Sequence, residues 1–201
     1  VCEHVRAGVD ERGEFSLALS GGRSPARMIA LLAADPGVPW GAVDVYQVDE
    51  RIAPPGHPDR NLTLLEATLP DARIHAMPVD GDDLVSAAAS YAALLPQSLD
   101  LVHLGLGVDG HTASLVPGCA ALQIRDRDVA ISMEYHGRRR MTLTYPAIDR
   151  AREVLWVVTG QDKAEALAQL MAGDPSMPAA HVSTPTQVVL ADQNAAARLY
   201  S

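Results

Sequence analysis

The sequence predicts a single α/β domain in which helices flank a mostly parallel β-sheet. The chain has 201 residues, of which 48% are hydrophobic, enough to bury a sizeable core. Strand-sized apolar runs alternate with segments of helical period from end to end, without a repeat or a linker. The runs are continuous, as in strands that are buried on both faces of a sheet. The expected fold is therefore Rossmann-like, with one domain over residues 1–201.

Five strand-then-helix units are expected along the chain. Each strand is a short apolar run that ends at a polar or glycine-rich segment, and each helix has apolar residues at three- and four-residue spacing. The expected strands lie at residues 15–19, 43–48, 101–106, 154–158 and 188–191. The expected helices lie at residues 26–34, 61–69, 83–95, 162–171 and 194–200, with Pro25 and Asp162 placed as helix starts.

Two further segments complete the expected fold. Residues 129–133 and 141–144 lie on either side of the turn sequence HGRRR, which predicts a small β-hairpin inserted in the second half of the chain. Residues 1–9 have apolar side chains at helical spacing, which predicts the end of a helix before the first strand.

Composition and charge exclude several classes of protein. The net charge of −9, from 16 basic and 25 acidic residues, argues against a nucleic-acid partner. No apolar run is long enough to span a bilayer, so no membrane partner is expected. Cys2 and Cys119 lie far apart, and the histidines lack metal-ligand spacing, so neither a disulfide nor a metal is expected. We expect a cytoplasmic protein, a monomer or a weak homodimer.

Polar or glycine-rich loops follow four of the expected strands. Their sequences are SGGRSP at residues 20–25, DER at 49–51, GLGVDGH at 105–111 and TGQDK at 159–163. The carboxyl ends of parallel strands meet at one edge of a sheet, and open α/β proteins bind their ligands there. The four loops therefore predict one shared pocket.

The first of these loops has the features of a phosphate cradle. Gly21 and Gly22 leave their backbone N–H groups accessible, Ser24 adds a hydroxyl, and a helix begins at Pro25. A tight strand-to-helix turn that needs glycine for its dihedral angles explains these residues equally well. The loop has neither the Walker pattern GxxxxGK[ST] nor GxGxxG.

The third loop places an imidazole where the chain turns off a buried strand. His111 is the candidate general base, because an unperturbed histidine pKa of about 6.5 suits proton transfer at neutral pH. The alternative is a surface turn that contains a histidine by chance, and the neighbouring glycines and the location favour the base. His103 lies inside the strand and is expected to be a core residue with satisfied hydrogen bonds.

Charged residues in the other loops and the hairpin are candidates for binding an anion. Arg51 can bind a phosphate or carboxylate through two nitrogens, with Asp49 to orient it, although an ordinary solvated ion pair is equally consistent. Lys163 is the single lysine among 16 basic residues and lies at a helix start, where it attracts an anion or is a surface charge. One arginine of residues 138–140 is expected to reach the same pocket.

Taken in order, these motifs resemble those of the 6-phosphogluconolactonase family, in the glucosamine-6-phosphate isomerase/6-phosphogluconolactonase superfamily. The matching segments are SGGRSP, DER, HPDRN at residues 57–61, GLGVDGHTASLVPG at 105–118, RMTLT at 140–144 and GQDKA at 160–164. The resemblance implies a cytoplasmic carboxylic ester hydrolase without metal or cofactor. Its substrate would be a sugar-phosphate lactone, 6-phospho-D-glucono-1,5-lactone, opened to 6-phospho-D-gluconate in the oxidative pentose phosphate pathway.

Roles for individual residues follow from this resemblance together with their chemistry. His111 is the expected base that activates water, and Asp109 or a backbone group in the same turn is expected to fix its tautomer. Arg51, with Asp49 beside it, and loop N–H groups are the candidates to stabilise the oxyanion or the ring oxygen. The phosphate and the sugar are expected to contact Ser20, Gly21, Gly22, Ser24, Asn61, Arg140 and Lys163. The absence of a GxSxG elbow favours direct attack by water over an acyl-enzyme.

Several departures from the family pattern stand out. Arg23 stands in SGGRSP where SGGSTP is usual, Arg60 replaces a common serine, and Val116 replaces a frequent phenylalanine. None of these changes removes a reacting group. The family's opening strand and much of its first helix have no counterpart, so we expect a lactonase domain whose start is incomplete.

Three rival functions are set against the lactonase. Glucosamine-6-phosphate deaminases typically have DEY and GHIAFNEPG where this chain has DER and GHTASLVPG, which favours the lactonase. A non-catalytic sugar-phosphate-sensing regulator needs a DNA-binding segment, and nothing before Phe15 is long or basic enough for one. The ribose-5-phosphate isomerase branch is disfavoured by the GHTAS segment.

Overall fold

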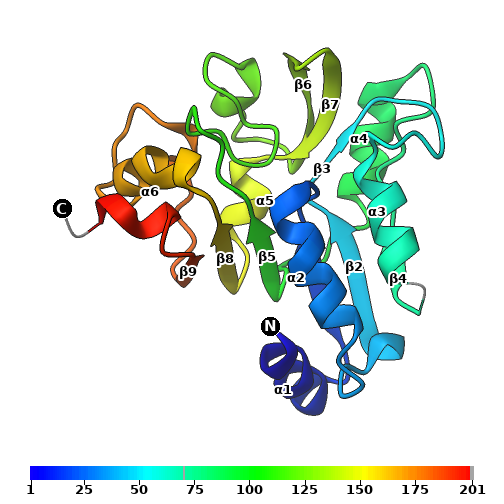
Figure 1. The fold of residues 1–201 in the computed structure, drawn as a ribbon. Coiled ribbons are helices and arrows are strands. Elements are labelled where there is room, and N and C mark those ends of the chain that lie inside the picture. Colours follow the sequence, from blue (N-terminus) through cyan, green and yellow to red (C-terminus); the bar gives the residue numbers. More distant parts are fainter. Residues whose placement is uncertain (70, 200–201) are drawn as a thin grey trace.

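The continuous apolar runs form a parallel sheet, as predicted, with helices on both of its faces (Figure 1). The structure is a computed structural model that describes residues 1–69 and 71–199, without the side chains of residues 23 and 24. Six strands pair in the order β4-β2-β1-β5-β8-β9, and every pair is parallel. They are β1 (Phe15–Leu19), β2 (Val43–Gln47), β4 (Arg73–His75), β5 (Leu101–Leu104), β8 (Glu153–Val158) and β9 (Gln187–Ala191).

The strand order reverses between β1 and β5. After β1 the chain builds β2 and β4 on one side, and then crosses over to build β5, β8 and β9 on the other side. Strands β1 and β5 are direct neighbours, with Leu17 opposite Leu101 in the register. Their carboxyl ends diverge into loops that leave in opposite directions, which opens a crevice at this point of a parallel sheet.

Each face of the sheet is covered by its own set of helices. Buried side chains of α1 (Cys2–Arg12), α2 (Arg23–Ala33) and α3 (Asn61–Thr68) share one hydrophobic cluster with Leu17 and Val45. Those of α4 (Leu84–Ala92), α5 (Tyr145–Asp149) and α6 (Ala164–Met171) share the other with Val102 and Trp156. Alternate residues of the same strands thus belong to opposite cores, which explains why the strands are apolar throughout.

A second, antiparallel sheet lies above the carboxyl edge of the first (Figure 1). The predicted hairpin forms two of its strands, β6 (Val129–Tyr135) and β7 (Arg138–Leu143). The third strand is β3 (Asp49–Arg51), for which we expected a loop. The backbone of β3 pairs with β7, with Arg51 opposite Arg140, so the DER segment satisfies its hydrogen bonds in a strand.

Several boundaries differ from the prediction. Helix α2 begins at Arg23 and not after Pro25, because Gly22 takes a positive φ of 113° and the first turn of a helix needs no proline N–H. A 3₁₀ turn (Gln161–Lys163) precedes α6, and a 3₁₀ helix (Ala195–Arg198) replaces the expected C-terminal helix, of which residue 200 lies outside the described residues. Strand β4 and helix α5 were not expected. None of the described helices is long and apolar enough to cross a membrane.

Candidate active site

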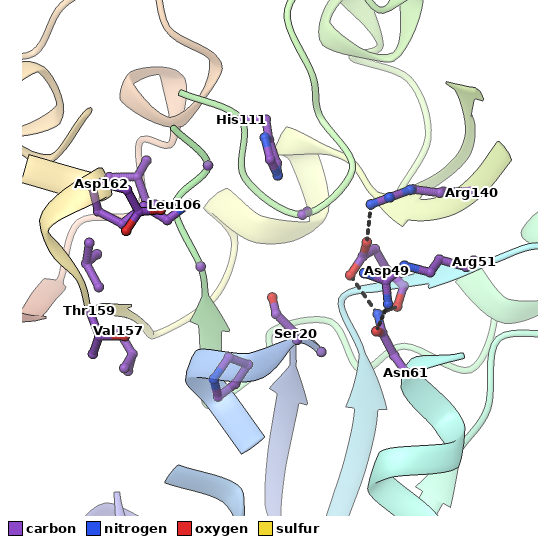
Figure 2. A pocket seen from close by; sticks show the side chains of 18 residues that line it. Ser20, Asp49, Arg51, Asn61, Leu106, His111, Arg140, Val157, Thr159 and Asp162 are labelled. Carbon is purple, nitrogen blue, oxygen red and sulfur yellow. Dashed lines mark hydrogen bonds and ion pairs between the residues drawn. The ribbon is translucent and has the colours of Figure 1, made fainter. Parts of the chain in front are cut away.

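A cavity of about 490 Å³ lies at the carboxyl ends of the parallel strands (Figure 2). The segments that follow β1, β2, β5 and β8 all contribute to its wall, together with β7 and the start of α3. The polar and glycine residues that line it are Ser20, Gly21, Gly22, Asp49, Arg51, Asn61, Gly105, Gly107, His111, Arg140, Thr159, Asp162 and Lys163. The structure therefore brings together residues that are up to 143 positions apart, between Ser20 and Lys163, at the switch point between β1 and β5.

His111 and Asp109 form a hydrogen-bonded pair in the loop after β5. Oδ1 of Asp109 lies 2.5 Å from Nδ1 of His111 and 3.3 Å from its backbone nitrogen. A carboxylate only accepts hydrogen bonds, so this contact assigns the proton to Nδ1 and leaves Nε2 with a lone pair. Figure 2 shows the imidazole reaching from its loop over the cavity. This arrangement is the one that a general base needs.

A tyrosine on the hairpin completes the surroundings of this pair. The hydroxyl of Tyr135 donates to Oδ2 of Asp109 over 3.0 Å. Partial burial raises the pKa of Asp109, but the hydrogen bonds from His111 and Tyr135 outweigh it and hold that pKa below its ordinary value. Tyr135 was not predicted as a site residue, because it lies between the expected strand 129–133 and the HGRRR turn, where a lone tyrosine carries no signal of its own.

Arg51, Asn61 and Asp49 form a network on one side of the cavity (Figure 2). Nη1 of Arg51 donates to Oδ1 of Asn61 over 2.8 Å, and Nδ2 of Asn61 donates to Oδ1 of Asp49 over 3.1 Å. The other carboxylate oxygen of Asp49 accepts a 2.6 Å hydrogen bond from the buried Ser114 hydroxyl. Asp49 therefore orients Arg51 through Asn61, and not by the direct pairing that the DER sequence suggested.

Glu50 anchors this network from below. Its side chain is fully buried, and its two carboxylate oxygens accept backbone N–H groups of Arg51, Asn61 and Leu62 at 2.7–2.9 Å. The last two are N–H groups of the first turn of α3, so Glu50 caps that helix and fixes where Asn61 stands. Glu50 was not predicted to have a role of its own, although a carboxylate beside a buried strand is a signal for a side chain that caps a helix.

Arg140 is the arginine of the HGRRR turn that reaches the cavity. Its side chain is almost fully buried, with Nη1 3.9 Å from Oδ2 of Asp49. Burial lowers the pKa of Arg140, and the guanidinium is still charged at neutral pH. Arg138 turns away to pair with Asp59, and Arg139 is exposed. Successive residues of a strand point to opposite faces, so Arg139 lies on the face opposite to Arg138 and Arg140.

The loop after β1 presents backbone, not hydroxyl groups, to the cavity. The hydroxyl of Ser20 donates to the carbonyl of His103 over 3.0 Å, so it braces two strands. A Cβ atom on Gly21 would lie 1.9 Å from Oδ1 of Asn61, so only glycine fits there. The side chain of Ser24, also expected to contact phosphate, lies outside the described residues. The N–H groups at the start of α2 remain the feature of this loop that suits an anion.

Lys163 lines the cavity from the 3₁₀ turn that precedes α6. Its ammonium group has a carboxylate of Asp162 at 3.8 Å, a loose contact that leaves it available to an anion. Together with Arg51 and Arg140 it makes three cationic side chains in the described wall of one cavity, in a chain whose net charge is −9. No group of three or more His, Cys, Asp or Glu residues suited to a metal ion occurs among the described residues.

The family model for glucosamine-6-phosphate isomerases and 6-phosphogluconolactonase matches residues 1–191 of the chain. A curated 6-phosphogluconolactonase from Nostoc sp. is 37% identical over 180 residues, which cover 82% of this chain and 74% of the relative. The crystal structure of a 6-phosphogluconolactonase from Shewanella baltica superposes with a TM-score of 0.84 at 26% identity, covering 94% of this chain and 88% of that one. The chain belongs to this family.

The fold of the glucosamine-6-phosphate isomerase/6-phosphogluconolactonase family does not by itself distinguish its activities. A monomeric glucosamine-6-phosphate deaminase superposes with a TM-score of 0.86 at 18% identity, covering 98% of this chain and 92% of that one. The side chains of the site must therefore distinguish the lactonase activity from the deaminase activity. Val116, which stands where the deaminase pattern has an acidic residue, is a buried apolar residue in this member of the family.

One expectation about the core of this family member was wrong. His103 is fully buried in β5, as predicted, but neither of its ring nitrogens has a hydrogen-bond partner. Burial lowers the pKa of His103 to about 4, so the ring is neutral. The sequence shows that a residue lies in a strand, but it does not show whether a polar partner stands opposite.

Proposed function

We propose that this chain is a 6-phosphogluconolactonase that hydrolyses 6-phospho-D-glucono-1,5-lactone, with His111 as the general base. The observation that carries the proposal is the His111–Asp109 pair facing a cavity that is also lined by Arg51, Arg140 and Lys163. A phosphorylated lactone needs both parts: a base for water next to its carbonyl and cations for its phosphate. We also expect it to act in the cytoplasm, as a monomer or a weak homodimer.

The reaction follows from the proton positions. Nε2 of His111 takes a proton from a water molecule as that oxygen attacks the lactone carbonyl, and Asp109 stabilises the imidazolium that forms. Arg51 stabilises the oxyanion of the tetrahedral intermediate. When the intermediate collapses, the bond from the carbonyl carbon to the ring oxygen breaks, and the imidazolium returns its proton to that oxygen. The new carboxylic acid then loses its proton to solvent.

The phosphate fixes the ring for this attack. The side chains of Arg140 and Lys163 supply positive charge for it, and the backbone N–H groups of Gly21 and Gly22 supply hydrogen-bond donors. Asn61 keeps Arg51 in place. Binding energy at the phosphate then positions the carbonyl, which lies at the other end of the substrate.

The test is lactone hydrolysis followed by proton release, corrected for spontaneous opening. His111→Ala is expected to lower kcat/KM by about 10²- to 10⁴-fold, the range for general-base catalysis, with an unchanged Tm. His4→Ala, an exposed histidine on α1, serves as the control with wild-type activity. A near-normal rate in the His111→Ala protein would refute the assignment. Turnover of glucosamine 6-phosphate in place of the lactone would favour the deaminase.

A further inference from the structure

Tyr135 touches both halves of the proposed site without lining the cavity. It is the last residue of β6, is half-buried, and is absent from the described wall of the cavity. Its hydroxyl contacts the His111–Asp109 pair. Its ring and its backbone carbonyl contact Arg140. A residue with such contacts can hold the two halves in one arrangement.

The phenol end acts on the base. Its hydroxyl donates to Oδ2 of Asp109 over 3.0 Å, while Oδ1 of the same carboxylate holds Nδ1 of His111. Burial, and then the hydrogen bond to Asp109, raise the pKa of Tyr135, so the hydroxyl keeps its proton at neutral pH. With both carboxylate oxygens engaged, Asp109 cannot rotate away from His111.

The ring and the backbone act on the cation. The guanidinium carbon of Arg140 lies 5.3 Å from the centre of the Tyr135 ring, within the range of a cation–π contact. Nη2 of Arg140 donates to the backbone carbonyl of Tyr135 over 3.2 Å. The same ring meets the His111 imidazole edge-on at 5.0 Å. The imidazole and the guanidinium are thus both in contact with one aromatic ring.

We propose that Tyr135 is a positioning residue that fixes the His111–Asp109 pair through its hydroxyl and Arg140 through its ring. The inference rests on the proposed function and adds a residue that is not itself in contact with the reacting atoms. Tyr135 links the position of His111 to that of Arg140, so the hairpin β6–β7 fixes the positions of both side chains.

The two contacts predict different effects on catalysis. Without the hydroxyl, Asp109 loses a hydrogen-bond donor and becomes more basic, so the pKa of Asp109 rises. Asp109 is also freer to rotate, which loosens the base. Without the ring, Arg140 loses its cation–π contact, and substrate binding weakens.

Tyr135→Phe and Tyr135→Leu separate these effects. We expect Tyr135→Phe to lower kcat by about 2- to 12-fold, the value of one hydrogen bond, with KM nearly unchanged. Tyr135→Leu should show the same kcat effect and, in addition, a KM raised by about 2- to 30-fold.

A matched control removes another tyrosine hydroxyl from the same fold. Tyr145 donates to the carbonyl of Pro178 over 2.8 Å, away from the cavity, so Tyr145→Phe should lower stability without lowering kcat. The other charged and titratable groups near Tyr135 and the cavity are the same in every variant. They are Arg51, Arg140, Lys163, Asp49, Asp162 and the ring of His136, which packs against Tyr135.

An NMR titration of the Asp109 carboxyl group, assigned by its loss in Asp109→Asn, tests the inference without turnover. An upward shift of the Asp109 midpoint in Tyr135→Phe, absent in Tyr145→Phe, supports it. An unchanged or lowered midpoint, or a Tyr135→Leu protein with the same KM as Tyr135→Phe, overturns it. A wild-type protein that leaves the lactone intact refutes the proposed function, and the titration then still decides the role of Tyr135.

Discussion

Gly107 lies against the imidazole of His111, and a Cβ atom at position 107 would stand 2.0 Å from Nδ1 and 2.6 Å from Oδ1 of Asp109. The His111–Asp109 pair therefore needs a glycine beneath it. We expect Gly107→Ala to displace the imidazole and to lower kcat/KM by at least about 100-fold, the lower part of the range for a general base. Steady-state kinetics with the lactone measure this loss.

A second glycine variant controls for the effect of alanine in a loop. Nothing lies within 4 Å of a Cβ atom built on Gly81, and its φ is not positive, so Gly81→Ala should keep wild-type kinetics and Tm. Full activity in Gly107→Ala would show that a Cβ atom at position 107 does not displace His111. A loss of activity matched by a loss of folded protein would place the effect in folding and not in the site.

Glu50→Gln should destabilise the protein. An amide nitrogen in place of either carboxylate oxygen would face N–H groups that now donate to that oxygen, so donors would meet donors in the core. We expect the free energy of unfolding to fall by about 2–4 kcal/mol, measured by urea denaturation. Glu66→Gln, at an exposed position of α3, the helix that Glu50 caps, should change this free energy little. Equal stabilities in the two variants would contradict a structural role for Glu50.

The sequence was most informative where one physical rule decides the outcome. Continuous apolar runs identified five of the six parallel strands, and the carboxyl-edge rule for open sheets placed four distant loops at one cavity. The position of His111 beyond β5 follows from the same rule. These inferences need only the order of elements along the chain, not the details of packing.

The sequence was least informative where tertiary contacts decide. The DER segment has no strand signal, and it becomes β3 only because the hairpin offers β7 as a partner. Which arginine of the turn faces inward depends on the register between Arg51 and Arg140, which no local pattern fixes. The contact of Tyr135 with Asp109 joins residues 26 positions apart, so the sequence around one residue does not indicate that the other is its partner.

Lys163→Gln should weaken the binding of the product, 6-phosphogluconate. The ammonium has only the Asp162 carboxylate at 3.8 Å among the described residues, so an anionic ligand gains a charge-assisted contact there. Calorimetry should show a Kd raised by about 10- to 100-fold, together with a weaker dependence on salt. Arg139→Gln removes the same charge from an exposed position of β7 and should leave Kd within about threefold. Similar Kd values for both variants would place the anion elsewhere.

His103 should make the fold sensitive to mild acid. In the unfolded chain a histidine binds a proton with a pKa of about 6.5, whereas burial lowers the pKa of His103 in the fold to about 4. Between these values the unfolded state holds more protons than the folded state, so the free energy of unfolding falls as the pH drops from about 6.5 towards about 4. At pH 5 this loss amounts to about 2 kcal/mol relative to pH 7.5.

Replacing His103 with leucine should remove this acid sensitivity. Leucine is close in volume to histidine and leaves no unpaired nitrogen in the core, so His103→Leu should be at least as stable as the wild type at pH 7.5. Urea denaturation at both pH values should then show a smaller loss of stability in the variant, by about 2 kcal/mol, because all other titratable groups are shared. If the two proteins lose the same amount, the unfolded and folded states bind the His103 proton equally, and its burial does not limit stability in acid.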